Sequence, residues 1–351
     1  WSIAPDAEIT TEANPDTVNE YYINELAAGG FTRVSFGMQS AVPHVLKTLD
    51  RTHTPANVAV GVNAAQGWAA LSVDLIYGAP GESLDDWRTS VTTAIDLGVN
   101  HISAYALTVE PTTKMGRQIA AGTLPKPNDD DGRKYEIADD LFAAAGLEWY
   151  EVSNWARPGY ESQHNLGYWR NVDWAGLGPG AHSHYNAVTE LTTPSRFADS
   201  PRWRELSGGC RTGGGFCLTR SAQLGHRAPA FVGHGHQREP VPWADSETIT
   251  PEENLEELIM LGLRLHEGLD LDRINRASTM RDEQHAPDSP NRFGDQLAPM
   301  ISEGLITVSD NHRVVPTRRG RLLNDSVIEQ FFDSSVYSRW YGARQSPLPV
   351  R

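Results

Sequence analysis

The chain has 351 residues, of which 39% are hydrophobic and 21% are charged, and its formal net charge at pH 7 is −15. This composition is ordinary for a soluble globular protein with one large domain and a smaller one. The negative charge disfavours nucleic acid and anionic lipid as partners, because it repels phosphate. No apolar run approaches the roughly 20 residues of a membrane span. We therefore expect a cytoplasmic protein that does not bind nucleic acid.

Alternating hydrophobic periods of about two and about 3.6 residues predict a succession of strands and helices. The predicted strands are 7–14, 32–39, 70–78, 101–108 and 147–154. Between them, Thr54 followed by Pro55 and Ser83 followed by "LDDW" are typical helix starts. This order predicts an α/β fold with a parallel sheet. A barrel is favoured over a doubly wound sheet, because no glycine-rich dinucleotide fingerprint follows a strand.

A second, smaller unit is predicted for residues 246–335. Thr250 caps an amphipathic helix whose first residue is Pro251. The residues that follow indicate helix, strand, Asp-Asn turn, strand and helix, a winged-helix-like α+β pattern. This pattern occurs in DNA-binding proteins, but the acidic balance of the chain disfavours DNA here. Residues 336–351 are expected to form a loose tail.

Polar residues interrupt or end the predicted strands. Asp74 lies inside the apolar stretch "LSVDLIYG", where an unpaired carboxylate is costly or takes up a proton. Glu12, Asn14, Gln39 and Ser40 fall at comparable positions at strand ends, and Arg51 follows in the stretch "LDRTH". Together at one mouth of a barrel, they would offer a guanidinium and several acceptors to a small zwitterionic ligand with a sugar. A structural aspartate that is capped or salt-bridged is the alternative for Asp74.

Seven stretches of the sequence together resemble one known family. They are EITTEANP, GFTRVSFGMQS, RTH, VDLIYGAPGES, HISAYALTVEP, YEVSNWARPG and HNLGYW. They resemble the radical S-adenosylmethionine (SAM) proteins related to oxygen-independent coproporphyrinogen III oxidase, and among these the heme chaperones. The resemblance covers about residues 5–186 and resumes near Ser246. It implies a partial (βα)6 TIM-like barrel over residues 1–189 and a small winged-helix-like C-terminal accessory domain.

The resemblance also implies the site residues. SAM would contact Glu12, Gln39, Arg51 and Asp74. The heme motif would be His164, Asn165, Leu166, Tyr168 and Trp169. His164 is the candidate axial ligand to heme iron, since a neutral imidazole nitrogen binds iron. His182 and His184 are alternative ligands, and without the resemblance a histidine that merely packs beside aromatic rings would be the simpler interpretation.

Three functions follow as alternatives from the resemblance. In the first, the parent protein is a heme chaperone that passes heme to an acceptor protein, with a membrane-bound respiratory protein as one candidate acceptor. In the second, it is a coproporphyrinogen III dehydrogenase. In the third, this chain is an inactive fragment. The HNLGYW motif favours the first.

Two departures from the family pattern concern the cysteines and the middle of the chain. The family binds a [4Fe–4S] cluster through a CxxxCxxC loop, which this sequence lacks and which we expect upstream of Trp1. Cys210 and Cys217 have the wrong spacing. They lie in residues 190–245, which show neither hydrophobic period and are rich in arginine between Pro201 and Pro240. This segment is interpreted as a shifted reading frame, with a basic loop for heme propionates or a partner as the alternative.

Overall fold

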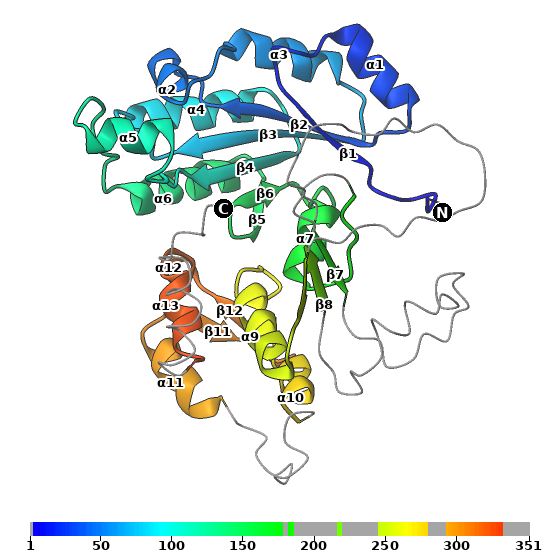
Figure 1. The fold of residues 1–351 in the computed structure, drawn as a ribbon, viewed down its shortest axis with the longest axis vertical. Coiled ribbons are helices and arrows are strands. Elements are labelled where there is room, and N and C mark those ends of the chain that lie inside the picture. The colour runs from blue at the N-terminus through cyan, green and yellow to red at the C-terminus, as the bar shows by residue number, and fades with distance from the viewer. Residues whose placement is uncertain (1–2, 178–181, 186–215, 220–244, 280–292, 333–351) are drawn as a thin grey trace. The chain divides into compact units, whose positions relative to one another are not determined.

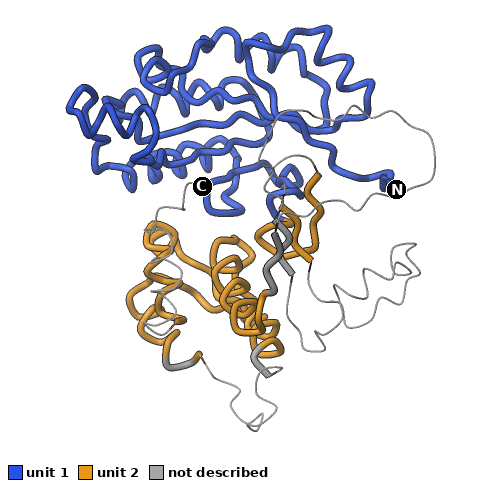
Figure 2. The backbone as a smooth tube through the Cα atoms, in the orientation of Figure 1, with its two compact units in different colours: residues 1–166 blue, residues 167–351 orange. Residues whose placement is uncertain are grey.

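The computed structural model describes residues 3–177, 182–185, 216–219, 245–279 and 293–332. The chain divides into two compact units, residues 1–166 and residues 167–351, which Figure 2 shows in blue and orange. None of the described helices combines the length and the apolar character that a bilayer-spanning segment needs.

The first unit contains a six-stranded sheet in the order β1-β2-β3-β4-β6-β5 (Figure 1). Its strands are β1 Thr10–Ala13, β2 Arg33–Gln39, β3 Ala70–Tyr77, β4 His101–Ala106, β5 Glu148–Glu151 and β6 Asn154–Ala156. Strands β1 to β4 pair in parallel, as the sequence predicts. The prediction is wrong for the last strand, because 147–154 contains a turn at Val152 and Ser153, and β6 pairs antiparallel with both β4 and β5.

Helices follow the parallel strands. They are α1 Glu20–Ala28, α2 Pro43–Thr48, α3 Pro55–Ala64, α4 Leu84–Asp96, α5 Lys114–Ala120, α6 Asp131–Ala144 and α7 Gln163–Trp169. The predicted caps are confirmed, since the side chains of Thr54 and Ser83 accept bonds from the amides of Asn57 and Asp86 in reciprocal capping boxes.

The core of the first unit lies between the sheet and its helices. Val34 and Phe36 of β2 and Val73 of β3 have no exposed surface. Trp87 of α4 and Phe142 of α6 belong to the same apolar cluster. Burying a side chain of this size stabilises the fold by about 1.5–3 kcal/mol. One face of the sheet is therefore covered by the helices, and the opposite face does not take part in this core.

The second unit contains two three-stranded sheets and five described helices. Its strands are β7 His182–Tyr185, β8 Phe216–Thr219, β9 Asp245–Thr248, β10 Leu269–Asp270, β11 Ile306–Val308 and β12 Arg313–Pro316. Its helices are α9 Pro251–Gly262, α10 Leu271–Thr279, α11 Gly294–Ser302, α12 Arg318–Leu322 and α13 Asn324–Glu329. The predicted cap at Thr250 and the predicted order of helix, strand, turn, strand and helix are both confirmed.

Strand β8 lies inside the segment that was expected to be irregular. It pairs antiparallel with β7 and with β9. A strand of four residues is too short to show a period against its surroundings, which is why the sequence does not reveal it. The rest of 190–244, including Cys210, and the tail 336–351 lie outside the described residues.

Candidate functional site

Polar side chains line one face of three neighbouring parallel strands. They occupy alternate positions: Arg33 and Ser35 on β2, Ser72 and Asp74 on β3, His101 and Ser103 on β4. The register places Ser35 beside Ser72, Ser72 beside His101, and Asp74 beside Ser103. Because successive side chains of a strand point to opposite faces, the apolar residues between them face the helices. A polar surface on a central sheet needs partners, and a ligand is one way to supply them.

Two cavities open on this polar face. The first has a volume of about 450 Å³, and Arg33, His101, His164 and Asn165 are among its lining residues. The second has a volume of about 310 Å³ and is lined by residues that include Asn14 and Arg51. The two cavities share part of their walls: Glu12, Ser35, Gln39 and Asp74.

The four residues implied for SAM therefore line one cavity. Glu12 comes from β1, Gln39 from the end of β2, Arg51 from the loop after α2, and Asp74 from β3. Gln39 has a left-handed backbone with φ of 61° where the pairing of β2 with β3 shifts register. Such a conformation is uncommon outside glycine and is found at binding and catalytic sites.

Ser40 does not belong to this group, although its position at the strand end suggested it. Its side chain is buried, and its Oγ lies 2.9 Å from the Oγ of Ser90 in α4. The chain turns at Gln39, so the next side chain points to the helix instead of the cavity.

Asp74 is a largely buried carboxyl group in the wall of both cavities. Burial raises its pKa, hydrogen bonds from Ser35 and Ser103 lower it, and the nearby charge of Glu12 raises it further, with a net increase. The Ser35 hydroxyl donates to Oδ2 at 2.8 Å. The salt bridge suggested as a structural alternative is absent from the interactions of the described residues.

His101 is the centre of a buried polar chain. Its Nδ1 lies 2.8 Å from the Ser72 hydroxyl, and its Nε2 lies 2.8 Å from the Tyr150 hydroxyl. Burial, with a smaller effect of Arg33, lowers the pKa of His101 to about 3. The imidazole is therefore neutral at pH 7, and each ring nitrogen has a hydroxyl partner.

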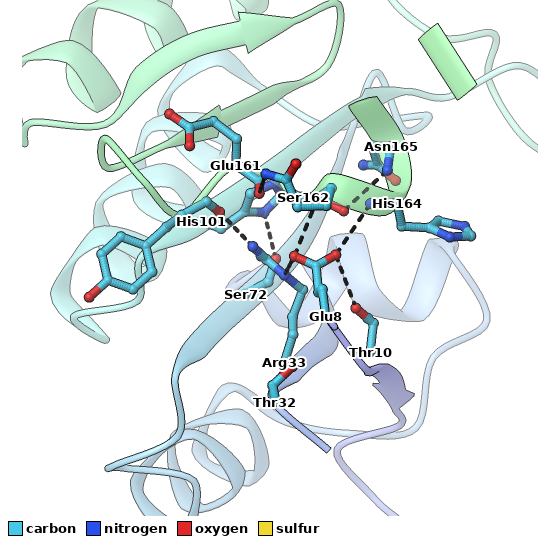
Figure 3. A network of polar contacts seen from close by, with 12 residues as sticks. Glu8, Thr10, Thr32, Arg33, Ser72, His101, Glu161, Ser162, His164 and Asn165 are labelled. Carbon is cyan, nitrogen blue, oxygen red and sulfur yellow. Dashed lines mark hydrogen bonds and ion pairs between the residues drawn. The ribbon is translucent and has the colours of Figure 1, made fainter. Parts of the chain in front are cut away.

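The motif HNLGYW begins helix α7. His164 is exposed and Leu166 is buried. The first turn lies against Glu8 and Arg33, and the imidazole of His164 points away from the Glu8 carboxylate (Figure 3). Glu8 therefore contacts the backbone of His164, on the side away from the imidazole.

The two aromatic residues of the motif have partners within the second unit. Tyr168 is 39% exposed, and its ring packs edge-on against Trp174 with centroids 5.1 Å apart. Trp169 lies under the guanidinium of Arg264, whose central carbon is 5.6 Å from the ring centroid. The alternative ligands lie in β7, where His182 is exposed and His184 is buried.

Comparisons with known proteins identify the family of the chain. The family described as HemN C-terminal domain matches residues 249–323. The heme chaperone HemW of Mycobacterium tuberculosis (strain ATCC 25618 / H37Rv) is 39% identical over 332 residues, which cover 93% of this chain and 72% of the relative. The chain belongs to the HemW family. HemW of Bacillus subtilis (strain 168) is 30% identical over 328 residues, covering 93% of this chain and 76% of the relative.

The fold of this HemW family member also has a solved counterpart. Coproporphyrinogen III oxidase (HemN) of Escherichia coli is similar with a TM-score of 0.60 at 20% identity, over 93% of this chain and 70% of that chain. This likeness confirms the expected α/β fold with a TIM-like radical SAM barrel and an accessory domain. The HemN C-terminal match spans helices α9 to α12.

Several residues of the site were not identified from the sequence. They are Glu8, Arg33, Ser35, Ser72, His101, Ser103, Tyr150 and Ser162. Alternation was a usable signal for those on strands, because a polar residue every second position in an apolar strand marks one face. Glu8, Tyr150 and Ser162 offer no such signal, since their roles depend on contacts between distant parts of the chain.

Proposed function

We propose that this chain is a heme chaperone of the radical SAM family, which binds heme as its cargo and passes it to an acceptor protein. The curated relatives named heme chaperone HemW support this function. The observation that carries it is the position of His164, exposed in the first turn of α7 and lining a cavity of about 450 Å³. An exposed ligand suits a carrier, because the acceptor must be able to reach the iron.

Exposed apolar and aromatic residues follow His164 along the sequence. A neutral imidazole is a common axial ligand of heme iron. Tyr168, Val172 and Leu177 are exposed apolar or aromatic residues that follow the ligand along the chain, at 39%, 46% and 94% exposure. Side chains of this kind gain free energy when a flat apolar ring covers them. We propose a protein as the acceptor, with a membrane-bound respiratory protein as the candidate.

The second cavity fits SAM as a cofactor. Its guanidinium at Arg51 suits a carboxylate, and the oxygens of Glu12, Gln39 and Asp74 suit an ammonium and hydroxyl groups. SAM would supply its reactive sulfonium group there. A [4Fe–4S] cluster requires thiolates at CxxxCxxC spacing, and this sequence contains only Cys210 and Cys217. No step of the proposal therefore uses the cluster.

The test is hemin titration of the 351-residue chain, followed by the Soret band. The unsubstituted chain is expected to shift the band, and His164→Ala is expected to remove the shift or to weaken hemin binding by about 100-fold, because iron loses its ligand. His312→Ala is a matched control, since His312 is exposed and paired with Asp272.

Two results would contradict the assignment. Equal hemin binding by the unsubstituted chain and by His164→Ala would exclude His164 as the ligand. Loss of the shift in His182→Ala, with His164→Ala unaffected, would move the ligand to β7.

A further inference from the structure

Each backbone amide in the first turn of helix α7 has a hydrogen-bond acceptor. The first N–H groups of a helix have no partner within it. Here the amide of Asn165 donates to the Ser162 hydroxyl at 3.3 Å, and the amide of Leu166 donates to the Ser162 carbonyl at 3.0 Å. The amides of Gln163 and His164 donate to Glu8, at 3.3 Å to Oε2 and 3.3 Å to Oε1. The carboxylate of Glu8, which is distant in sequence, thus accepts the two remaining amides at the start of the helix, and one of these belongs to the proposed iron ligand.

Arg33 holds that carboxylate in place. Its Nε donates to Glu8 Oε2 at 3.0 Å, and a terminal nitrogen donates to the Tyr160 carbonyl at 2.6 Å (Figure 3). The side chain of Arg33 is 4% exposed and that of Glu8 is 17% exposed. One guanidinium therefore fixes both the carboxylate and the loop that leads into α7. Such charge-assisted bonds in a largely buried site are stronger than neutral ones.

A second group supports the same turn from another strand. The Tyr150 hydroxyl of β5 accepts from the Ser162 amide at 3.3 Å. His101 of β4 fixes this hydroxyl from its other side. The start of α7 is thus connected to β2 through Arg33 and to β4 and β5 through Tyr150.

We propose that Glu8 and Arg33 are positioning residues that fix the backbone at His164 and so set the direction of its imidazole for heme iron. This inference rests on the proposed function. Glu8 bonds to the main-chain amide of His164, and the imidazole points away from the Glu8 carboxylate (Figure 3), so this bond orients the residue through its backbone. Outer groups that orient a metal ligand change metal affinity by about 10- to 100-fold when they are removed.

The deciding variant is Glu8→Gln, compared with Glu161→Gln. A glutamine keeps one acceptor oxygen but replaces the other with a donor, so it cannot offer each amide an oxygen of its own, and it loses the charge that pairs with Arg33. Glu161 is a matched control, because its carboxylate accepts from the Gly159 amide two residues before it. In the heme-free chain, hydrogen exchange at the amides of Gln163 and His164 is expected to accelerate about 10-fold or more in Glu8→Gln and to stay unchanged in Glu161→Gln.

Hemin binding provides the second readout. Glu8→Gln is expected to weaken hemin binding by about 10-fold and to change the electron paramagnetic resonance signature of the axial ligand. Measurements are made at a temperature where circular dichroism shows both variants folded. Arg33→Lys, which keeps the charge but loses the planar fork, is expected to give the same selective acceleration of exchange if Glu8→Gln does not fold.

The outcomes separate the two proposals. Unchanged exchange at Gln163 and His164 in a folded Glu8→Gln or Arg33→Lys chain would overturn the positioning role. So would hemin binding and a ligand signature identical to those of the unsubstituted chain. Hemin binding that does not depend on His164 would instead overturn the proposed ligand, while the exchange data still decide whether Glu8 fixes the backbone.

Discussion

His101 is buried between two hydroxyl groups and stays neutral in the folded protein. An unfolded histidine has a pKa near 6.5, whereas burial lowers the pKa of His101 to about 3 in the folded state. Below about pH 6.5 the unfolded chain binds a proton that the folded chain does not bind. The free energy of unfolding therefore falls as the pH falls from about 6.5 toward 3.

His101→Gln is expected to reduce this pH dependence. The unsubstituted chain should lose up to about 1.4 kcal/mol of stability per pH unit from this residue, and the variant should not. The measurement is urea denaturation between pH 4.5 and 6.5. The slopes of the unfolding free energy against pH are compared, because the substitution also removes bonds to Ser72 and Tyr150 and so changes the absolute stability. His44→Gln, at an exposed histidine near Asp86, is the control. Equal slopes in the unsubstituted chain and His101→Gln would refute a buried neutral His101.

At the scale of elements, the second cavity is built from the ends of β1 and β2, from β3, and from the loop after α2. Parallel strands bring such positions together, which is why Glu12, Gln39 and Asp74 could be predicted as one group from the sequence. The prediction is wrong for Ser40. Gln39 has a left-handed backbone conformation, so the side chain of the next residue points toward Ser90 instead of the cavity.

Arg51→Ala is expected to weaken SAM binding by the chain by about 10-fold, because a charged hydrogen-bond donor to a carboxylate is lost. Equilibrium dialysis with labelled SAM measures this. Arg88→Ala is the matched control, since Arg88 is exposed in α4 and pairs with Asp85. Equal loss in both variants, or no loss in Arg51→Ala, would refute the assignment of Arg51.

Two other features of the chain cannot be predicted from local sequence patterns. The stretch 147–154 has no glycine or proline to mark its turn. Its pattern therefore predicts one strand, whereas the structure has a hairpin. Residue 8 lies in a predicted strand, yet its carboxylate bonds to Arg33 and also to the amides of residues 163 and 164, more than 150 positions away. Local sequence patterns predict helices, strands and caps. Contacts between residues far apart in the sequence form only when the sheet is assembled, so local patterns do not reveal them.

At the scale of the whole molecule, each of the two compact units has an apolar core of its own. Phe36, Val73 and Trp155 belong to the first core. Leu263, Met300 and Val314 belong to the second. Proteins with separate cores commonly depart from two-state unfolding, so we expect the units to open with different free energies.

Leu263→Ala is expected to destabilise the second unit by about 2–5 kcal/mol, because Leu263 has no exposed surface and leaves a cavity. Hydrogen exchange followed by mass spectrometry should show faster exchange in β11 and β12, with β3 and β4 unchanged. Leu323→Ala is the control, since Leu323 is 44% exposed. Acceleration of β3 and β4 to the same extent would show that the two cores unfold together.

The alternation along β2, β3 and β4 has a consequence for how such a protein diverges. Neighbouring residues of one strand face different surroundings: Val73 and Ile102 belong to the apolar core, while Ser72 and Ser103 line the first cavity. Because the two sets project to opposite sides of one backbone, selection acts on them separately. Substitutions that face the cavity can therefore change the ligand without changing the residues that form the core.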